Sequence, residues 1–151
     1  MAIAEDNLVL CLVLRAGLPL HQGVLSFFDK SENAFISAYR KHNENDDDFE
    51  VIVEYLAVPT LEGKILVLID PMLATGKTLH NVLKAFKNHG ILKQILIISV
   101  IGSQLGVDYI SKVFPENSHL WIAAIDETLS AKGNIIPGLG DAGDLAFGLK
   151  L

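Results

Sequence analysis

The sequence predicts a single α/β domain in which helices cover both faces of a mostly parallel sheet. Three short segments are almost continuously apolar, at residues 8–14, 65–69 and 95–101, which is typical of strands buried on both faces. Amphipathic segments with helical spacing alternate with them, as β-α-β crossovers require. The chain has 151 residues, of which 50% are hydrophobic and 20% charged. It is therefore long enough to bury one core.

The remaining elements follow from the same patterns. We expect strands at residues 8–14, 34–39, 49–57, 65–69, 94–101 and 119–125, and helices at 19–28, 77–89 and 104–114. Pro19 suits the first turn of the first helix, where a missing N–H costs nothing. Gly90 is expected to end the second helix as its C′ residue. Pro115 stops the third helix, because proline cannot continue it.

Two segments are predicted to lack regular structure. Residues 41–48 are polar and acidic with no apolar anchor, so we expect a solvated loop whose base can still carry function. Residues 135–144, Ile-Ile-Pro-Gly-Leu-Gly-Asp-Ala-Gly-Asp, contain too much glycine and proline for a helix or a strand. The aromatic residues with core-like spacing are Phe27, Phe28 and Trp121.

The charge balance excludes several classes of partner. Twelve basic and 18 acidic residues give a formal net charge of −6, so we expect no nucleic-acid or anionic-membrane surface. The apolar runs are shorter than the roughly 20 residues of a membrane helix, and the N-terminus lacks the basic residues of a secretory signal. We therefore expect a soluble cytoplasmic protein. Cys11 is the single cysteine and lies in an apolar run, which predicts a buried hydrophobic role.

A candidate ligand site follows the strand that ends before Asp70. Ligands of open parallel sheets bind beyond the carboxyl ends of the strands. Backbone N–H groups of residues 74–78 can converge on an anion there, helped by the dipole of the following helix. Gly76 lets the backbone approach a phosphate closely, and Thr75 and Thr78 add hydroxyl donors. Asp70 suits sugar hydroxyls, so this segment predicts a ribose-phosphate site.

Two alternative interpretations apply to this segment. Its letters Ala-Thr-Gly-Lys-Thr resemble the end of a Walker A loop, but that motif requires glycine where this chain has Pro71. Proline offers no N–H to a phosphate, which disfavours a mononucleotide kinase. An ordinary strand–loop–helix junction with a Thr-Gly turn remains the other alternative.

The glycine-rich segment 135–144 is a second candidate site. Gly138, Gly140 and Gly143 permit tight turns with positive φ, which expose backbone N–H and C=O groups side by side. Such a loop can hold the edge of a flat polar heterocycle. A purely structural C-terminal turn is the alternative.

Five segments together resemble the uracil phosphoribosyltransferase family. In chain order they are Leu-Arg-Ala-Gly at 14–17, Tyr39-Arg40, Asp-Pro-Met-Leu-Ala-Thr-Gly at 70–76, Ala-Ala-Ile-Asp-Glu-Thr-Leu at 123–129, and the segment 135–144. The resemblance covers nearly the whole chain, and the combination of the third and fifth segments is highly specific. It implies a type I phosphoribosyltransferase fold and a single catalytic core over residues 1–151. The implied activity is pyrimidine salvage, in which uracil and 5-phosphoribosyl 1-diphosphate (PRPP) give UMP and pyrophosphate with Mg²⁺.

The resemblance also implies roles for single residues. Those implied in PRPP binding are Arg15, Arg40, Asp70, Pro71, Met72, Leu73, Ala74, Thr75, Gly76, Lys77, Thr78 and Asp141. Those implied in uracil binding are Ile135, Gly140, Asp141 and Ala142, through backbone groups. The expected catalytic residues are Arg15, Arg40 and Asp141, with both arginines on the diphosphate. No direct protein ligand is expected for Mg²⁺, which would lie near Asp141 through PRPP and water.

These roles fit the chemistry of the transfer. Departure of pyrophosphate leaves an oxocarbenium-like ribose, so fixed guanidinium groups and a metal would stabilise the leaving group. A main-chain loop would hold uracil N1 over the ribose C1. Cytosine reverses part of uracil's acceptor–donor–acceptor edge and would leave a buried backbone group unpaired. The sequence suggests no general base for N1.

Two departures from the family pattern stand out. The family's loop often ends Ala-Thr-Gly-Gly-Ser, whereas here Lys77 and Thr78 follow Gly76; the backbone N–H of Lys77 still serves. The chain also begins almost at the Leu-Arg-Ala-Gly strand, whereas family members carry a substantial segment before it, so the core is expected to be short at its N-terminus. A non-proline cis peptide is expected beside Arg15-Ala16, aiming main-chain groups at the diphosphate.

The alternative function is a non-catalytic nucleotide- or PRPP-sensing domain on the same fold. Arg15 and Arg40 argue against it, because a sensor needs no clamp for a leaving group. The resemblance further implies a homo-oligomer, a dimer or higher, and GTP as an effector.

Overall fold

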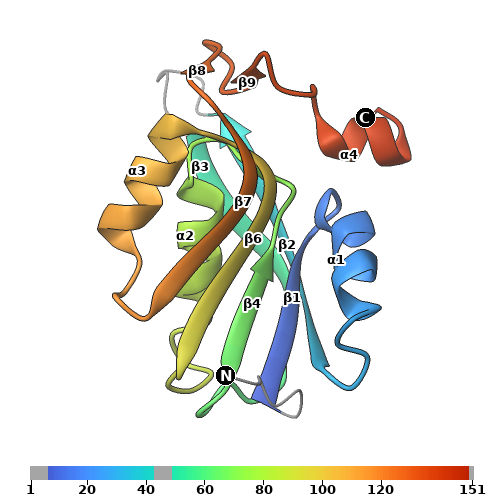
Figure 1. The fold of residues 1–151 in the computed structure, drawn as a ribbon, viewed down its shortest axis with the longest axis vertical. Helices are drawn as coiled ribbons and strands as arrows, with labels where there is room; N and C mark the ends of the chain where they lie inside the picture. The colour runs from blue at the N-terminus through green and yellow to red at the C-terminus, as the bar shows by residue number, and fades with distance from the viewer. Residues whose placement is uncertain (1–6, 43–48, 150–151) are drawn as a thin grey trace.

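The computed structural model describes residues 7–42 and 49–149, without the side chains of residues 39–42 and 49–52. The described residues form a seven-stranded sheet with helices on both faces (Figure 1). Its strands are β1 (Leu8–Leu14), β2 (Glu32–His42), β3 (Phe49–Ala57), β4 (Ile65–Ile69), β5 (Met72–Leu73), β6 (Gln94–Ser103) and β7 (Ser118–Asp126). The helices are α1 (Gly17–Leu25), α2 (Lys77–Ala85), α3 (Gln104–Val113) and α4 (Ala142–Phe147), and a separate hairpin pairs β8 (Thr128–Leu129) with β9 (Ile135–Ile136).

The strand order confirms the predicted, mostly parallel sheet. Strand β1 lies between β2 and β4, and β6 follows β4, all in parallel register. Strand β7 runs parallel to β6 at one edge, and β3 runs antiparallel to β2 at the other. The chain leaves β1 towards β2 but later returns to place β4 on the other side. The boundary between β1 and β4 is therefore the switch point at which such sheets open a ligand crevice.

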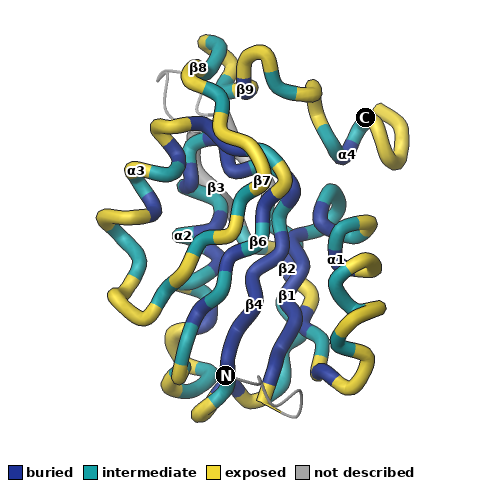
Figure 2. Tube along the Cα trace, viewed as in Figure 1, coloured by how far each residue is buried: buried dark blue, intermediate teal, exposed yellow. Residues whose placement is uncertain are grey.

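The core consists of two layers, one on each face of the sheet. Helices α2 and α3 cover one face, where the buried side chains include Val9, Cys11, Leu66, Leu68, Leu79, Val82, Phe86 and Ile110. Helix α1 covers the other face, where Leu20, Val24 and Leu25 pack on Leu8, Leu10, Ile65, Val67 and Ile69. Figure 2 shows that β1 and β4 form the buried centre, whereas much of β7 is exposed. Burial of a large aliphatic side chain contributes about 1.5–3 kcal/mol, so these central strands anchor the domain.

The edge position of β7 corrects the prediction for two aromatic residues. Trp121 is 67% exposed and Phe27 is 80% exposed, so their expected placement in the core is wrong, whereas Phe28 does pack against the α1 layer. Trp121 faces away from the α3 layer, to which Leu120 and Ile122 belong. Among the described residues, α1 covers β1 and β4 and does not reach the β7 end of that face.

Two helices end earlier than their periodicity predicts. Helix α1 spans Gly17–Leu25, so Pro19 is its third residue, and helix α2 stops at Ala85. Beyond α2 the chain continues in tighter turns, in which the N–H of Phe86 and of Lys87 bonds three residues back, each at 3.2 Å. Gly90 lies after these turns with φ of +129°, and a Cβ there would lie 2.4 Å from the backbone N of Glu62. Gly90 is therefore required by a close backbone approach and does not cap α2.

Short elements occur where the sequence predicts irregular chain. Strand β9 and the start of α4 fall within 135–144, which corrects the prediction that this segment holds no regular element. Strand β9 forms because Ile135 pairs with Leu129, and α4 begins because the Asp141 side chain caps it. Strand β5 forms within the loop after β4, because β6 extends beyond β4 and pairs with it. The pairing of β5 with β6 depends on a partner distant in sequence.

None of the helices in the described ranges is long and apolar enough to cross a membrane. Cys11 is fully buried in β1, between Ala34 of β2 and Leu68 of β4. This confirms its predicted role as a small core residue. Burial raises the pKa of its thiol to about 12, because an apolar environment disfavours the thiolate.

We expect Cys11 to resist alkylation in the native protein. Incubation with iodoacetamide at pH 8 should leave it unmodified by mass spectrometry, because the thiolate is the nucleophile and is disfavoured in the core. The same reaction in guanidinium chloride should add one carboxamidomethyl group per chain. Rapid modification without denaturant would contradict the burial of β1.

Candidate functional site

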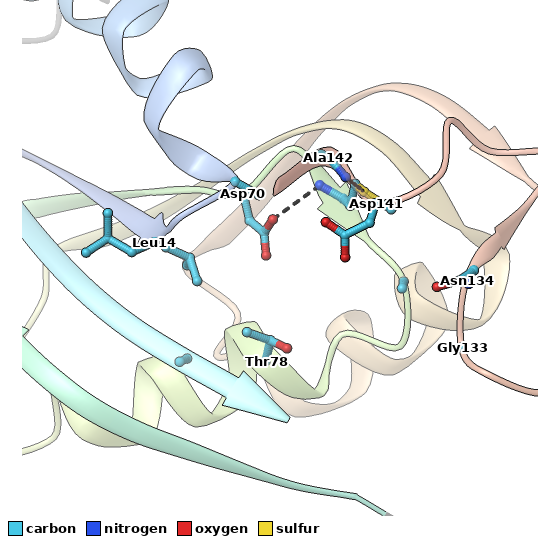
Figure 3. A pocket seen from close by; sticks show the side chains of 12 residues that line it. Leu14, Asp70, Thr78, Gly133, Asn134, Asp141 and Ala142 are labelled. Carbon is cyan, nitrogen blue, oxygen red and sulfur yellow. Dashed lines mark hydrogen bonds between the residues drawn. The ribbon is translucent and has the colours of Figure 1, made fainter. Parts of the chain in front are cut away.

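A cavity of about 320 Å³ opens at the carboxyl ends of β1 and β4 (Figure 3). It is lined by Val13, Leu14, Ala16, Ala38, Asp70, Met72, Ala74, Thr78, Gly133, Asn134, Asp141 and Ala142. The lining thus combines the end of β1, the interior of β2, the loop after β4 with β5, the first turn of α2 and two segments of the C-terminal region. It lies at the switch point of the sheet, where ligand binding is expected.

Asp70 is the first residue beyond the buried strand β4 and is held by β6. Its backbone N–H donates to Ile98 at 3.2 Å, and its carbonyl accepts from the Ser99 hydroxyl at 2.7 Å. Oδ1 accepts from the N–H of Met72 at 3.2 Å. Figure 3 shows that the carboxylates of Asp70 and Asp141 point into the same space. An oriented acceptor therefore lies at the tip of β4, as predicted.

The loop after Asp70 is supported by the start of α3. Ser103 is fully buried, its hydroxyl donates to the carbonyl of Ala74 at 2.5 Å, and its Oγ accepts from the N–H of Gly106 at 2.9 Å. Gly106 allows this approach, because a Cβ there would lie 2.4 Å from the Ala74 oxygen. One serine thereby caps α3 and positions the loop that precedes α2.

The first turn of α2 has the properties of an anion-binding site. Its N-cap is Gly76, with φ of +74° and no side chain to cap the helix, and the N-terminal end of the helix dipole favours an anion there. Thr78 lines the cavity from this turn. The Thr75 hydroxyl does not line the cavity and instead accepts from the N–H of Lys77 at 3.4 Å.

Helix α2 itself contains a histidine with a shifted pKa, His80. Nδ1 of His80 lies 2.7 Å from the hydroxyl of Tyr109, whose ring lies beside Gly76. Partial burial, with a smaller contribution from the charge of Lys84, lowers the pKa of His80. This shift favours the neutral form of His80.

The turn between β1 and α1 forms a second wall of the cavity. Leu14 and Ala16 line it, and the peptide bond between Leu14 and Arg15 is cis. This bond adjoins Arg15-Ala16, where a non-proline cis peptide was expected. The guanidinium of Arg15 is not part of the lining and pairs with the carboxylate of Asp144 in α4.

The C-terminal tail, from β9 through α4 (residues 135–147), crosses the carboxyl end of the sheet and returns to the β1–α1 turn (Figure 1). Gly138 has φ of +58°, and its N–H donates to Oδ2 of Asp126 at 2.9 Å. The peptide bond between Ile136 and Pro137 is cis. At the far end of the tail, the N–H of Ala142 donates to Sδ of Met72 at 3.3 Å. These contacts bring the tail to the same cavity as the loop after β4.

The structure brings six of the predicted site residues to one cavity. The predicted residues that line the cavity are Asp70, Met72, Ala74, Thr78, Asp141 and Ala142. The others with described side chains, which lie outside the lining, are Arg15, Pro71, Leu73, Thr75, Gly76, Lys77, Ile135 and Gly140. The backbone of Arg40 pairs with Val51, but its side chain lies outside the described part of the structure.

Sequence reasoning missed Gly133 and Asn134, which line the cavity from the β8–β9 turn. The turn is closed by Ser130, whose N–H donates to the carbonyl of Asn134 at 2.8 Å and whose Oγ accepts from its N–H at 3.0 Å. A Gly-Asn pair is a turn signal, but its place beside Asp141 depends on the path of the tail. Asp144 was also missed as a partner of Arg15.

Comparisons with known proteins agree on one family. The family model for uracil phosphoribosyltransferase matches residues 1–149. Similar proteins of that name occur in Porphyromonas gingivalis, 50% identical over 150 residues, covering 99% of this chain and 69% of the relative. The relative from Methanothermobacter thermautotrophicus is 40% identical over 144 residues, covering 95% of this chain and 64% of the relative.

Solved structures share the fold. The AQ2163 protein of Aquifex aeolicus has a TM-score of 0.86 at 33% identity, covering 99% of this chain and 69% of that protein. A purine phosphoribosyltransferase from Pyrococcus horikoshii has a TM-score of 0.59 at 19% identity, covering 83% of this chain and 81% of that protein. The latter likeness concerns the fold alone and confirms the predicted phosphoribosyltransferase fold.

We expect Gly76→Ala to destabilise the protein by about 1–3 kcal/mol, because a side chain at positive φ is strained. Its Cβ would also lie 2.9 Å from Cδ1 of Tyr109. The matched control is Gly23→Ala in the middle of α1, where a Cβ meets nothing within 4 Å; it should stabilise by about 0.5–1 kcal/mol. Urea unfolding measures both, and equal midpoints for the two variants would contradict the geometry of Gly76.

Proposed function

Because this chain belongs to the uracil phosphoribosyltransferase family, we propose that it transfers the phosphoribosyl group of PRPP to N1 of uracil, giving UMP and pyrophosphate. The observation that carries the proposal is the cavity at the switch point. Three features meet there: the oriented carboxylate of Asp70, the first turn of α2, which has no side-chain cap, and the backbone of the tail at residues 141–142. These are the parts that a sugar, a phosphate and a flat base require.

The ribose 5-phosphate half of PRPP fits the side of the cavity formed by β4 and α2. Asp70 accepts hydrogen bonds from the ribose hydroxyls, and the first turn of α2 binds the 5-phosphate. Thr78 contributes a hydroxyl from the cavity wall. The support for this assignment is the position of the two groups on the same cavity, on successive elements of the chain.

The diphosphate half is assigned to Arg15, Arg40 and Mg²⁺. The donor set fits this metal, because Mg²⁺ keeps several waters and binds one or two carboxylates together with substrate phosphates. The carboxylates of Asp141 and Asp70 both face the cavity and would hold it through water and PRPP. When bound, Mg²⁺ neutralises charge on the leaving diphosphate. The guanidinium groups bind the same oxygens.

The uracil edge is assigned to backbone groups of Ile135 and of residues 140–142. The N–H of Ala142 supports this assignment, because its acceptor is the thioether sulfur of Met72 at 3.3 Å. Thioether sulfur is a weak acceptor, so a carbonyl oxygen of uracil can replace it with a gain in hydrogen bonding. The main-chain pattern would select uracil over cytosine, which presents a donor where uracil presents an acceptor.

These assignments describe a transfer driven by position and electrostatics. The C1–O bond to the diphosphate breaks as the bond to uracil N1 forms, and positive charge develops on the ribose. The proton of uracil N1 passes to the departing pyrophosphate or to water. The arginines stabilise the negative charge that accumulates on the leaving group. The tail holds N1 over C1, which supplies the proximity that the reaction needs.

Further expectations for this chain stay predictions. They are a homo-oligomer of at least two copies, GTP as an effector, a cytoplasmic location, and no contact with nucleic acid or membrane. Size measurement in solution, with and without GTP, would test the first two.

We expect the purified chain to release pyrophosphate from PRPP when both uracil and Mg²⁺ are present. Cytosine should give at least roughly 100-fold lower kcat/KM, because it leaves a buried backbone group unpaired. Coupled detection of pyrophosphate with chromatographic identification of UMP measures both. Binding of PRPP or UMP without turnover would contradict the catalytic function and favour the sensing alternative.

We expect Thr78→Val to raise the KM for PRPP roughly fivefold with kcat nearly unchanged, because it removes one neutral hydrogen bond made in ground and transition states alike. Thr60→Val is the matched control, since Thr60 is exposed and does not line the cavity. Steady-state kinetics at saturating uracil distinguish the two variants. Equal KM values for the two variants would contradict the assignment of Thr78 to the phosphate site.

A further inference from the structure

Asp144 contacts two of the described residues that are assigned to the diphosphate side, Arg15 and Asp141. Its carboxylate accepts a hydrogen bond from Nη2 of Arg15, and its backbone N–H donates to Oδ1 of Asp141 at 2.9 Å. The side chains of Arg15 and Asp144 are only 33% and 32% exposed, so water screens the pair less than at an open surface. One residue of α4 thus bridges the turn after β1 and the cap of the tail helix.

The first turn of α4 packs directly against Arg15. A Cβ on Gly143 would lie 3.5 Å from Nε of Arg15, 3.8 Å from Cβ of Ala16 and 3.2 Å from Oδ1 of Asp141. Glycine therefore leaves no side chain between the helix and the turn. A guanidinium has five N–H donors, so a contact through Nη2 holds the group and leaves it the capacity to bind a further anion.

A carboxylate beside a diphosphate site is unfavourable for binding, because like charges repel. The carboxylate of Asp144 must therefore offset this repulsion, and it can do so by ordering the side chain of Arg15 before PRPP binds. A free arginine side chain loses rotamer entropy when it is immobilised. An arginine that Asp144 already orients has lost most of that freedom before PRPP arrives, as preorganised sites require.

We propose that Asp144 is a positioning residue, which orients Arg15 towards the diphosphate of PRPP and links its position to that of Asp141. The inference rests on the proposed function. It adds a residue outside the predicted set and assigns it a role through Arg15, with no contact to substrate.

Asp144→Asn is the informative variant, because it removes the charge while it keeps the size of the side chain and the backbone N–H to Asp141. We expect kcat/KM for PRPP to fall roughly tenfold, as for the loss of a charged hydrogen bond. The KM for uracil and the melting temperature should change little. Asp144→Glu keeps the carboxylate and should recover part of the loss. A role limited to docking α4 would move the KM for uracil and the melting temperature instead.

A double-mutant cycle separates action through Arg15 from independent effects. In an Arg15→Ala background, Asp144→Asn should add less than about a twofold further loss, because its partner is already absent. The matched control is Asp108→Asn, which makes the same chemical change on the exposed face of α3, where Asp108 accepts from Gln104 at 2.8 Å. It should behave as wild type.

Turnover by the wild-type chain is measured first, so that the two proposals fail separately. With an active wild type, an unchanged kcat/KM for PRPP in Asp144→Asn, a tighter affinity for PRPP, or a full additional loss in the Arg15→Ala background overturns the positioning role alone. With an inactive wild type the proposed activity fails, and calorimetric titration of PRPP decides the role of Asp144. Roughly tenfold weaker binding by the variant then supports it, and equal affinity, or no binding by wild type, overturns it.

Discussion

The site depends on the complete burial of β4 between β1 and β6. The five residues Ile65–Ile69 are at most 7% exposed, and an ionised group within such a strand would lose its hydration without compensation. The charged residue that follows must therefore emerge at the carboxyl end of the sheet, where Asp70 lies. The same end receives the turn after β1 and the first turn of α2. Parallel packing of apolar strands thus brings polar groups from three parts of the chain to one edge.

The C-terminal tail completes the site that forms at the carboxyl end of the sheet. Helix α4 has six residues, which is too short to be stable alone in water. Asp141 caps it locally, and two tertiary contacts hold it: Asp144 pairs with Arg15, and Ala142 bonds to Met72. These contacts involve residues that are assigned to substrate binding. The same contacts therefore hold the tail in place and position the site. The base-binding and phosphate-binding halves are linked through Met72 and Arg15.

The net charge of −6 does not conflict with a polyanionic substrate. A charge total describes the solvated surface, whereas binding in a cavity depends on the groups that face it at short range. Here the groups suited to phosphate are the N–H groups of the first turn of α2, next to two carboxylates that suit a hydrated magnesium ion. The guanidinium of Arg15 lies outside the lining, where it pairs with Asp144. The carboxylates make the site acidic locally, which is consistent with a reaction that uses a metal and arginine together.

By itself the sequence determined the sheet, its parallel order and the residues at the tip of β4. These depend on local hydrophobic patterns and on one general rule, that parallel strands present their carboxyl ends together. Only the tertiary structure decided the ends of α1 and α2, the short elements β5, β9 and α4, the exposure of Trp121, and the approach of Gly133, Asn134 and Asp144 to the site. Several of these depend on a partner far along the chain: β6 for β5, Glu62 for Gly90 and Arg15 for Asp144. Strand β9 depends on its hairpin partner Leu129. The physical reason is that local patterns specify which faces are apolar, whereas the positions of short polar segments are set by hydrogen bonds and ion pairs that form only after the core has packed.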